Sequence, residues 1–395
     1  MMKETGMRVL HVGKFYPPFP GGMENFMGDL LPALERRGVT TAALVHHHEF
    51  GKRMNSARDR EERIDRVSSY GNFLYTPVSP GFPLALRRAI RAFRPHILHL
   101  HVPNTSAFWV MAIPAAARIP WVVQWQSDIV RSVFDRRLAV AYNLYRPLEQ
   151  RLLGRAAVIV SSSLRYLESS EPLSPWRGKC RVVPLGIDGN RLCRPDREQV
   201  RWAEEAVWHR GCARILSIGR LTYYKGHEIL IQAASLMPDV HVVIVGQGDR
   251  KKHLKQRIAA LGLERRVTLQ GFVPDHQIRA LLATCDMFCL PSIERTEAFG
   301  LVILEAMGYE KPVVASDVEG SGMGWIVRHG ETGFLVPPGN PRAMADALRF
   351  LTGNPDVRRR MSRAALERFD ADFHIDRVAR EIHAMYEDVL SSRET

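Results

Sequence analysis

The sequence predicts an α/β protein made of two doubly wound, Rossmann-like domains that face each other across a cleft. Three observations support this fold class. The chain has 395 residues, too many for one ordinary hydrophobic core and suitable for two domains of ~200 residues each. Strand-like and helix-like segments alternate along it, which is typical of a parallel sheet covered by helices. The alternation stops near residues 182–188, where Pro184 and Gly186 interrupt it, and then begins again.

The first domain is expected to span residues 1–186. A strand that ends at Val12 leads through a glycine-rich turn to an amphipathic helix that ends before Gly38. The remaining elements of this domain are strands at 40–47, 96–103 and 121–128 and a helix at 84–95. We expect residues 46–70 to form a long polar loop, and its three histidines, which have no suitable partner ligands nearby, are not expected to bind a metal.

The second domain is expected to span residues 187–372. It repeats the pattern with strands at 213–220, 240–248, 267–273, 287–292 and 312–318 and helices at 227–237, 250–262, 276–285 and 298–307. Residues 373–395 contain a last amphipathic helix that has no sheet partner left, and we expect it to cross back and brace the first domain.

Composition indicates a folded protein of the cytoplasm. Hydrophobic residues make up 46% and charged residues 25%, as in soluble globular proteins. No apolar run approaches the ~20 residues of a membrane-spanning helix, and the N-terminus leads into a strand rather than a signal peptide. The five cysteines form no metal-binding pattern, so we expect free thiols and no metal site.

The net charge of +13 is concentrated in the first half of the chain. Residues 1–181 hold 26 Lys and Arg against 14 Asp and Glu, a balance of +12, whereas the remaining residues balance to +1. Arg87, Arg88, Arg91 and Arg94 lie in one expected helix together with apolar residues, as in an interfacial helix. This half is either directed at an anionic surface or simply well solvated.

Two glutamates eight residues apart form the strongest chemical signal. Glu297 precedes Gly300, where a helix is expected to start, and Glu305 lies one to two turns inside that helix. Unpaired N–H groups at a helix start attract a phosphate or a sugar hydroxyl. Two carboxylates so placed could hold different ends of one ligand. The alternative is an acidic helix start stabilised by the helix dipole.

Two cations follow the first strand of the second domain. Arg220 and Lys225 lie where ligands bind in doubly wound sheets, and together they could neutralise a diphosphate leaving group. The alternative is an ordinary surface pair.

Glycine-rich turns occur in both domains. Gly21 and Gly22 would let the first domain's backbone approach a ligand closely, or would simply make a tight turn. Gly246 and Gly248 suggest a dinucleotide fingerprint, but Lys251 stands where its third glycine belongs, so no nicotinamide cofactor is expected.

Taken in order, nine motifs resemble glycosyltransferase family 4, whose members are retaining enzymes with the GT-B fold. They are Gly21-Gly22, HLHVPN, QSDIV, VVPLGID, GRLTYYKG, VGQG, LQGFVPD, the Glu297 and Glu305 pair, and GETGFLVPPGN. Their order and spacing agree from about Arg8 to Leu390. Within the family, the chain is similar to bacterial mannosyltransferase-like enzymes of O-antigen and exopolysaccharide synthesis.

The resemblance implies roles for individual residues. Arg220 and Lys225 would bind the donor diphosphate, Glu305 the ribose hydroxyls, and Glu297 the transferred sugar. His101 would be a catalytic histidine of the first domain, although an ordinary core histidine is the alternative. Further donor contacts would come from Phe299, Gly300, Leu301, Val302, Gly21, Gly22, Phe272 and Val273, the last two near the base.

The chain departs from the family where many relatives carry a histidine, because Gln126 stands there, followed by Ser127 and Asp128. We expect Gln126 and Asp128 to contact the sugar or the acceptor. A mechanism that needs a titrating group at position 126 is therefore in doubt.

The sequence as a whole predicts a retaining hexosyltransferase that needs no metal. GDP-mannose is the first expected donor and a UDP-hexose the second, with a lipid-linked glycan as acceptor. We expect a cytoplasmic protein peripherally bound to the inner face of the membrane through its basic first domain. The alternatives are a sugar-nucleotide epimerase of similar fold and a basic nucleic-acid-binding protein, but no recognition helix or aromatic-interleaved basic strand supports the latter.

Overall fold

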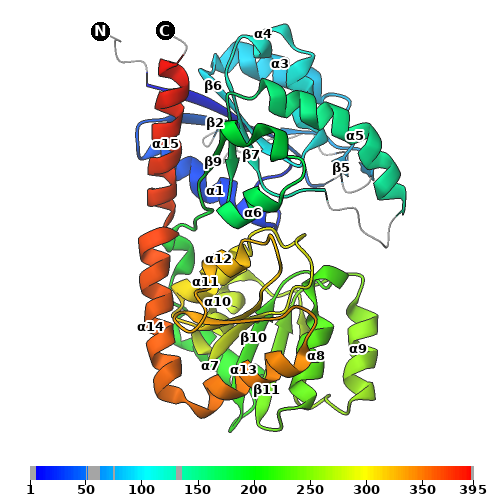
Figure 1. Ribbon diagram of the computed structural model, residues 1–395. Coiled ribbons are helices and arrows are strands. Elements are labelled where there is room, and N and C mark those ends of the chain that lie inside the picture. The colour runs from blue at the N-terminus through cyan, green and yellow to red at the C-terminus, as the bar shows by residue number, and fades with distance from the viewer. Residues whose placement is uncertain (1–5, 50, 52–62, 74–75, 130–135, 393–395) are drawn as a thin grey trace. The chain divides into compact units, whose positions relative to one another are not determined.

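The computed structural model describes residues 6–49, 51, 63–73, 76–129 and 136–392. They divide into two compact units (Figure 1). Unit 1 comprises Met1–Gly186 together with Ile375–Thr395, and unit 2 comprises Ile187–His374. The chain therefore passes from unit 2 to unit 1 between His374 and Ile375, two residues beyond the boundary expected from the sequence.

Unit 1 is built on a seven-stranded parallel sheet in the order β3-β2-β1-β6-β7-β8-β9. The strands are β1 (Arg8–Val12), β2 (Thr40–His46), β3 (Ile64–Val67), β6 (Ile97–Val102), β7 (Trp121–Trp125), β8 (Val158–Ser161) and β9 (Cys180–Val182). A short antiparallel pair, β4 (Asn72–Phe73) and β5 (Thr76–Pro77), follows β3. The helices are α1 (Gly22–Glu35), α3 (Phe82–Phe93), α4 (Pro114–Ala117), α5 (Arg136–Arg155), α6 (Leu164–Ser169) and α15 (Ile375–Ser391).

Strand β3 corrects the expectation of one long loop over residues 46–70. Ile64 is buried, and Ile64–Val67 pairs in parallel with Ala43–His46 of β2 at the sheet edge. The charged residues around this short strand hide its signal in the sequence. Residues 52–62 lie outside the described residues.

Helices cover both faces of the unit 1 sheet. Because neighbouring residues of a strand point to opposite faces, His11 and Leu10 lie on different sides. Helix α15 packs on the His11 face, where Tyr386 meets His99, and lies beside α1 (Figure 1). Helix α3 packs on the other face, where its Phe82 stacks on His46 of β2.

Unit 2 is built on a six-stranded parallel sheet in the order β12-β11-β10-β13-β14-β15. The strands are β10 (Ala213–Ile218), β11 (Val240–Val245), β12 (Val267–Gly271), β13 (Met287–Leu290), β14 (Val313–Ser316) and β15 (Gly333–Val336). The helices are α7 (Arg197–Trp202), α8 (His227–Ser235), α9 (Lys251–Ala260), α10 (Asp275–Thr284), α11 (Leu301–Gly308), α12 (Met323–Ile326), α13 (Pro341–Gly353) and α14 (Pro355–Asp372).

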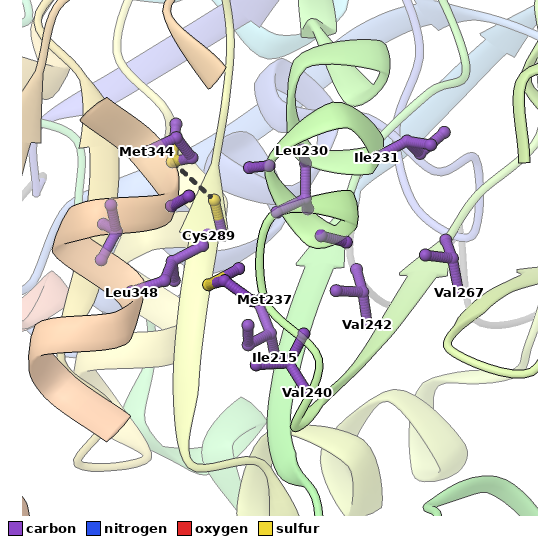
Figure 2. Packing of buried hydrophobic residues seen from close by; sticks show 14 of the residues in the cluster. Ile215, Leu230, Ile231, Met237, Val240, Val242, Val267, Cys289, Met344 and Leu348 are labelled. Carbon is purple, nitrogen blue, oxygen red and sulfur yellow. Dashed lines mark hydrogen bonds between the residues drawn. The ribbon is translucent and has the colours of Figure 1, made fainter. Parts of the chain in front are cut away.

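The core of unit 2 lies between its central strands and helices α8 and α13. Figure 2 shows Leu230 and Ile231 of α8 and Met344 and Leu348 of α13 packed around buried strand residues such as Cys289. Such burial stabilises by roughly 25 cal/mol for each Å² of apolar surface removed from water. This packing fixes β10 and β13, whose ends carry the candidate site.

Candidate active site

The candidate site of unit 2 lies where two loops meet at the carboxyl edge of its sheet. The chain proceeds from β10 outward through β11 to β12 and then returns to β13 on the other side of β10. Such a reversal point is where ligands bind in doubly wound sheets. The loops that follow β10 and β13 are joined there by a hydrogen bond of 2.8 Å from the Ile293 N–H to the Tyr224 carbonyl.

Glycines permit these loops to touch. Gly226 has φ +64°, and a Cβ there would lie 2.0 Å from the Pro291 carbonyl oxygen. A Cβ at Gly246 would lie 1.9 Å from the Gly219 oxygen. Real Cβ atoms cannot approach backbone so closely. The glycines that suggest a dinucleotide fingerprint thus have a packing reason in this fold.

Lys225 and Glu297 form an ion pair between the two loops. Lys225 belongs to η5 (Tyr223–Lys225), and its Nζ lies 2.5 Å from Glu297 Oε2, with side chains only 10% and 11% exposed. The Ser292 hydroxyl donates to the same oxygen over 3.1 Å. A buried charge pair with further hydrogen bonds holds one geometry well. The structure therefore brings together two residues that the sequence placed only on separate loops.

Arg220 lies on the same loop as Lys225 but in solvent. Its side chain is exposed, and its Nη2 donates a 2.9 Å hydrogen bond to the Tyr224 hydroxyl. The loop after β10 thus offers one buried and one exposed cation. An exposed guanidinium can swing onto an arriving phosphate and bind it through two N–H groups.

Helix α11 starts where the sequence predicts. Gly300 is its N-cap, with φ +88°, and the first N–H groups of a helix have no partner within it. The Phe299 ring is buried against Trp325 and Phe373. The Phe299 ring therefore points into the core, and only the main chain of Phe299 is left at the helix start. It lies there beside Gly300, Leu301 and Val302.

Glu305, inside α11, pairs with a residue that sequence reasoning missed. Arg191 Nη2 donates to Glu305 Oε1 over 3.0 Å. Burial raises the pKa of Glu305, whereas the charge and hydrogen bond of Arg191 oppose that rise. The two residues are 114 positions apart, and the sequence gives no role to Arg191 although it lies three residues after the VVPLGID motif.

Phe272 and Val273, predicted near the base, follow β12. Gly271 turns the chain with φ +76°, after which Phe272 is 67% exposed and Val273 is buried. A phenyl ring this exposed at the carboxyl edge of the sheet can stack on a planar base.

Comparison with known proteins decides the family. Residues 21–186 match the family described as glycosyl transferase 4-like domain, and residues 201–368 match glycosyl transferases group 1. D-rhamnosyltransferase WbpZ of Pseudomonas aeruginosa is 35% identical over 74% of this chain and 74% of its own length. O-antigen chain mannosyltransferase C of Escherichia coli is 29% identical over 98% of this chain and all of its own. The chain belongs to glycosyltransferase family 4.

Solved structures confirm the GT-B fold. Sucrose-phosphate synthase from Thermosynechococcus elongatus matches with a TM-score of 0.80 at 20% identity, covering 98% of this chain and 100% of its own. Anabaena HepE in complex with UDP-glucose matches with a TM-score of 0.76 at 22% identity, covering 97% and 100%. The predicted fold and family are confirmed, and this family 4 glycosyltransferase is a hexosyltransferase.

Unit 1 of this glycosyltransferase carries Gly21 and Gly22 at the start of α1. Gly21 is the N-cap, and a Cβ there would lie 2.1 Å from Glu24 Oε2. The missing side chain thus accommodates the Glu24 carboxylate beside the helix start. Donor contacts from these glycines remain a prediction.

His101 lies in the interior of unit 1. It is only 3% exposed, and its Nε2 lies 3.0 Å from His11 Nδ1. Burial lowers its pKa to about 3. The imidazole is therefore neutral at physiological pH and can exchange hydrogen bonds without carrying charge. Its predicted catalytic role must operate in that form.

His11, His99 and His101 are close enough to hold a metal ion, with ligand nitrogens within 4.8 Å of one another. However, the rings of His99 and His101 are stacked 4.7 Å apart at 13°. A ligating imidazole keeps the metal in its own plane, whereas stacked rings present faces to each other. His99 Nδ1 also lies 2.5 Å from the Tyr386 hydroxyl. We interpret the cluster as neutral imidazoles that join β1, β6 and α15.

Gln126 and Asp128 follow β7 but are engaged differently. Gln126 is buried, and its Nε2 has no hydrogen-bond partner among the described residues. Asp128 Oδ1 accepts from Trp125 Nε1 over 2.9 Å and from the Ser170 hydroxyl over 2.7 Å. Asp128 therefore braces the segment, whereas a ligand contact of the unpaired Gln126 amide remains a prediction.

Helix α3 carries its arginines outward. Arg87, Arg88, Arg91 and the C-cap Arg94 are exposed, whereas Phe82, Leu86 and Ile90 are buried against the sheet. This corrects the interfacial-helix expectation, because the apolar face of α3 belongs to the core of unit 1 and cannot enter a bilayer. Across the described part of the chain, helices long and apolar enough to cross a membrane are lacking.

Proposed function

We propose that this glycosyltransferase moves a hexose, with retention of configuration, from a nucleoside-diphosphate sugar to a lipid-linked glycan in cell-surface polysaccharide synthesis. The observation that carries the proposal is the Lys225 and Glu297 ion pair beside Arg220 and the start of α11. Cations there suit a diphosphate, and a carboxylate held by a lysine suits the hydroxyls of the transferred sugar.

The named relatives favour mannose or a related hexose. They include a D-rhamnosyltransferase, an O-antigen chain mannosyltransferase and a phosphatidyl-myo-inositol mannosyltransferase of Mycobacterium leprae, the last 31% identical over 98% of each chain. GDP-mannose is therefore the first donor to test and a UDP-hexose the second, since the HepE structure holds UDP-glucose.

The chemistry that fits these residues is substitution on the front face of the sugar. The bond from the anomeric carbon to the diphosphate oxygen breaks while the acceptor oxygen bonds to the same face. The acceptor proton passes to the leaving diphosphate. Arg220 and Lys225 would stabilise the charge that develops there, so we propose that the reaction needs neither a protein nucleophile nor a metal ion.

The exposed arginines of α3 support association with the inner face of the cytoplasmic membrane. Since the apolar side of the helix is buried, attraction would come from charge alone. Each cation near an anionic membrane contributes about 1 kcal/mol.

A panel of nucleotide sugars, offered with a polyprenyl-diphosphate oligosaccharide, tests the proposal. Wild-type protein should transfer sugar from one donor. The kcat of Lys225→Ala should be lower by on the order of 100-fold or more, which is the typical effect of removing one group that stabilises the transition state. Lys255→Ala, which alters an exposed lysine of α9, should match the wild type. Transfer from no donor, or equal rates for both variants, would contradict the proposal.

A further inference from the structure

Arg191 lies in the first segment of unit 2, three residues after the VVPLGID motif and outside the loops that follow β10 and β13. It belongs to η3 (Gly189–Leu192). The Asp188 side chain caps this turn by accepting from the Asn190 N–H over 2.9 Å, and the Asp188 carbonyl accepts from the Arg191 N–H over 2.9 Å. The backbone that presents Arg191 is therefore fixed locally.

Three consecutive residues attach this segment to one face of α11. Arg191 pairs with Glu305. A Cβ added at Gly308 would lie 2.3 Å from the Leu192 side chain, so the two pack closely. The Cys193 carbonyl accepts a hydrogen bond of 2.8 Å from the Tyr309 hydroxyl. Positions 305, 308 and 309 share a face of the helix. Gly308 thus permits the close approach that brings Arg191 to Glu305.

The surroundings of Glu305 make Arg191 necessary for its charge. Burial raises the pKa of Glu305, and the like charge of Asp275 on α10 raises it further. Arg191 provides the opposing positive charge and a hydrogen bond, while Tyr309 on the same helix is a neutral neighbour whose own pKa is raised to about 12. An ionised carboxylate has about four acceptor positions, so one bond from Arg191 leaves room for two hydroxyl donors.

We infer that Arg191 is a positioning residue that holds Glu305 ionised and oriented to accept the ribose hydroxyls of the nucleotide donor. The inference rests on the proposed function, which makes Glu305 the ribose-binding carboxylate. Arg191 acts through Glu305 and need not touch the nucleotide.

Removing hydroxyls from the ligand isolates this role. Binding of GDP and of 2′,3′-dideoxy-GDP, and of the corresponding UDP pair, is measured by calorimetry on the full chain. Hydrogen bonds to a charged group are strong, so the wild type should prefer the better ribonucleotide over its dideoxy form by on the order of 30-fold. Arg191→Ala should reduce that preference to less than about 3-fold.

Two variants control for charge and folding. Arg194, three residues on, is 91% exposed and lies 3.9 Å from Glu310, so Arg194→Ala removes a matched but solvent-exposed pair and should keep the full preference. Arg191→Lys retains the positive charge but has only an ammonium group in place of the guanidinium, so it should recover part of the ribose preference. Melting curves of all variants verify that each is folded.

The pH dependence separates positioning from a general loss of structure. A carboxylate binds hydroxyls best when ionised, so the ribose preference should rise with pH as Glu305 loses its proton. Without Arg191 the pKa of Glu305 rises further, and this increase should move to higher pH in Arg191→Ala. A purely structural defect would lower binding of ribo and dideoxy ligands equally at every pH.

The possible results distinguish the inference from the proposed function. If the wild type binds neither GDP nor UDP, or if Glu305→Ala keeps the ribose preference, the proposed donor site itself is wrong. If Glu305→Ala loses the preference but Arg191→Ala keeps it from pH 5.5 to 8.5, the role of Arg191 is overturned. Loss of the ribose preference in both Glu305→Ala and Arg191→Ala, with partial recovery in Arg191→Lys, supports the positioning role of Arg191.

Discussion

At the scale of single residues, we propose that two carboxylates in different surroundings have different roles in the candidate site. Glu297 is held by Lys225 and Ser292 next to the proposed reaction centre. Glu305 lies within α11, where Arg191 offsets the cost of burying it. A group near the reacting atoms affects the transition state, whereas one near the ribose affects binding in both states.

We therefore expect Glu305→Ala and Glu297→Ala to differ in kind. Glu305→Ala should raise the donor KM by about 10-fold or more with little change in kcat, because it removes uniform binding. Glu297→Ala should lower kcat by on the order of 100-fold. Steady-state kinetics with varied donor measure both. Small, equal effects from the two substitutions would contradict the roles assigned to Glu297 and Glu305.

Gln126 should act through hydrogen bonding rather than proton transfer. Its Nε2 lacks a partner among the described residues, and an amide does not titrate near neutral pH. Gln126→Ala should cost about 1 to 3 kcal/mol in kcat/KM, and Gln126→His should leave substantial activity. Turnover from pH 6 to 9 tests this. The hypothesis would be wrong if Gln126→His were much faster than the wild type and its pH–rate profile gained a new inflection typical of a histidine. That result would show that the wild-type chemistry lacks a base at this position.

Glu149 of α5 should make unit 1 less stable as pH rises. Burial raises its pKa to about 7, the charge of Asp128 adds to that rise, and Tyr142, Arg146 and Gln150 partly offset it. The protonated side chain stabilises the fold below the unfolded pKa near 4.5, and this contribution of about 3 kcal/mol is lost as pH rises through 7.

Melting curves of wild type and Glu149→Gln between pH 5 and 8 measure this effect. The glutamine imitates the protonated carboxyl, so its melting temperature should exceed that of the wild type increasingly as pH rises. Other groups titrate alike in both proteins and cancel in the difference. A difference that stays constant with pH would refute the pKa assignment.

Single residues mark the limit of sequence-based prediction. Arg220, Lys225 and Glu297 could be chosen because each lies in a loop that follows a strand at the carboxyl edge of a parallel sheet, and Glu305 because it lies in the helix that starts there. Arg191 could not, because its partner is 114 positions away and their pairing depends on how η3 packs on α11.

At the scale of elements, the sequence predicts the strands of the second domain well but misses the long helices α5, α13 and α14 and the short strands of the first domain. All the strands expected in the second domain are present. In the first domain β8 has four residues and β9 three, which is too few to show alternation. The burial of one face of α3 could not be distinguished from membrane insertion, because both need the same amphipathic pattern.

Helix α3 should nevertheless bind anionic vesicles by charge. Neutralising Arg87, Arg88 and Arg91 to glutamine should weaken binding to phosphatidylglycerol-containing vesicles by on the order of 100-fold, at about 1 kcal/mol for each arginine. Binding by the wild type should fall steeply between 50 mM and 500 mM salt. Cosedimentation measures both.

The matched control for α3 lies on α14. Arg359, Arg360 and Arg363 are also exposed, and neutralising them removes the same net charge from unit 2. If that variant loses as much binding as the α3 variant, net charge rather than α3 is responsible. Binding that ignores salt would contradict an electrostatic role.

At the scale of the whole molecule, the uneven distribution of charge along the chain agrees with the proposed division between an acceptor-binding first half and a donor-binding second half. Residues 1–181 carry +12, whereas the second half of the chain, which carries the proposed donor site, is nearly neutral overall. A basic first half would raise the local concentration of the proposed anionic acceptor. A neutral second half confines attraction for the donor to the site itself.

The configuration of the product tests the central claim most directly. The enzyme is supplied with the α-linked nucleotide sugar that it uses and with a lipid-diphosphate acceptor, and the new linkage is determined by the one-bond carbon–proton coupling at the anomeric carbon in NMR spectra. Front-face substitution at the Lys225 and Glu297 pair predicts an α-linked product, formed by the wild type and formed on the order of 100-fold more slowly by Glu297→Ala. A β-linked product would contradict the proposed mechanism.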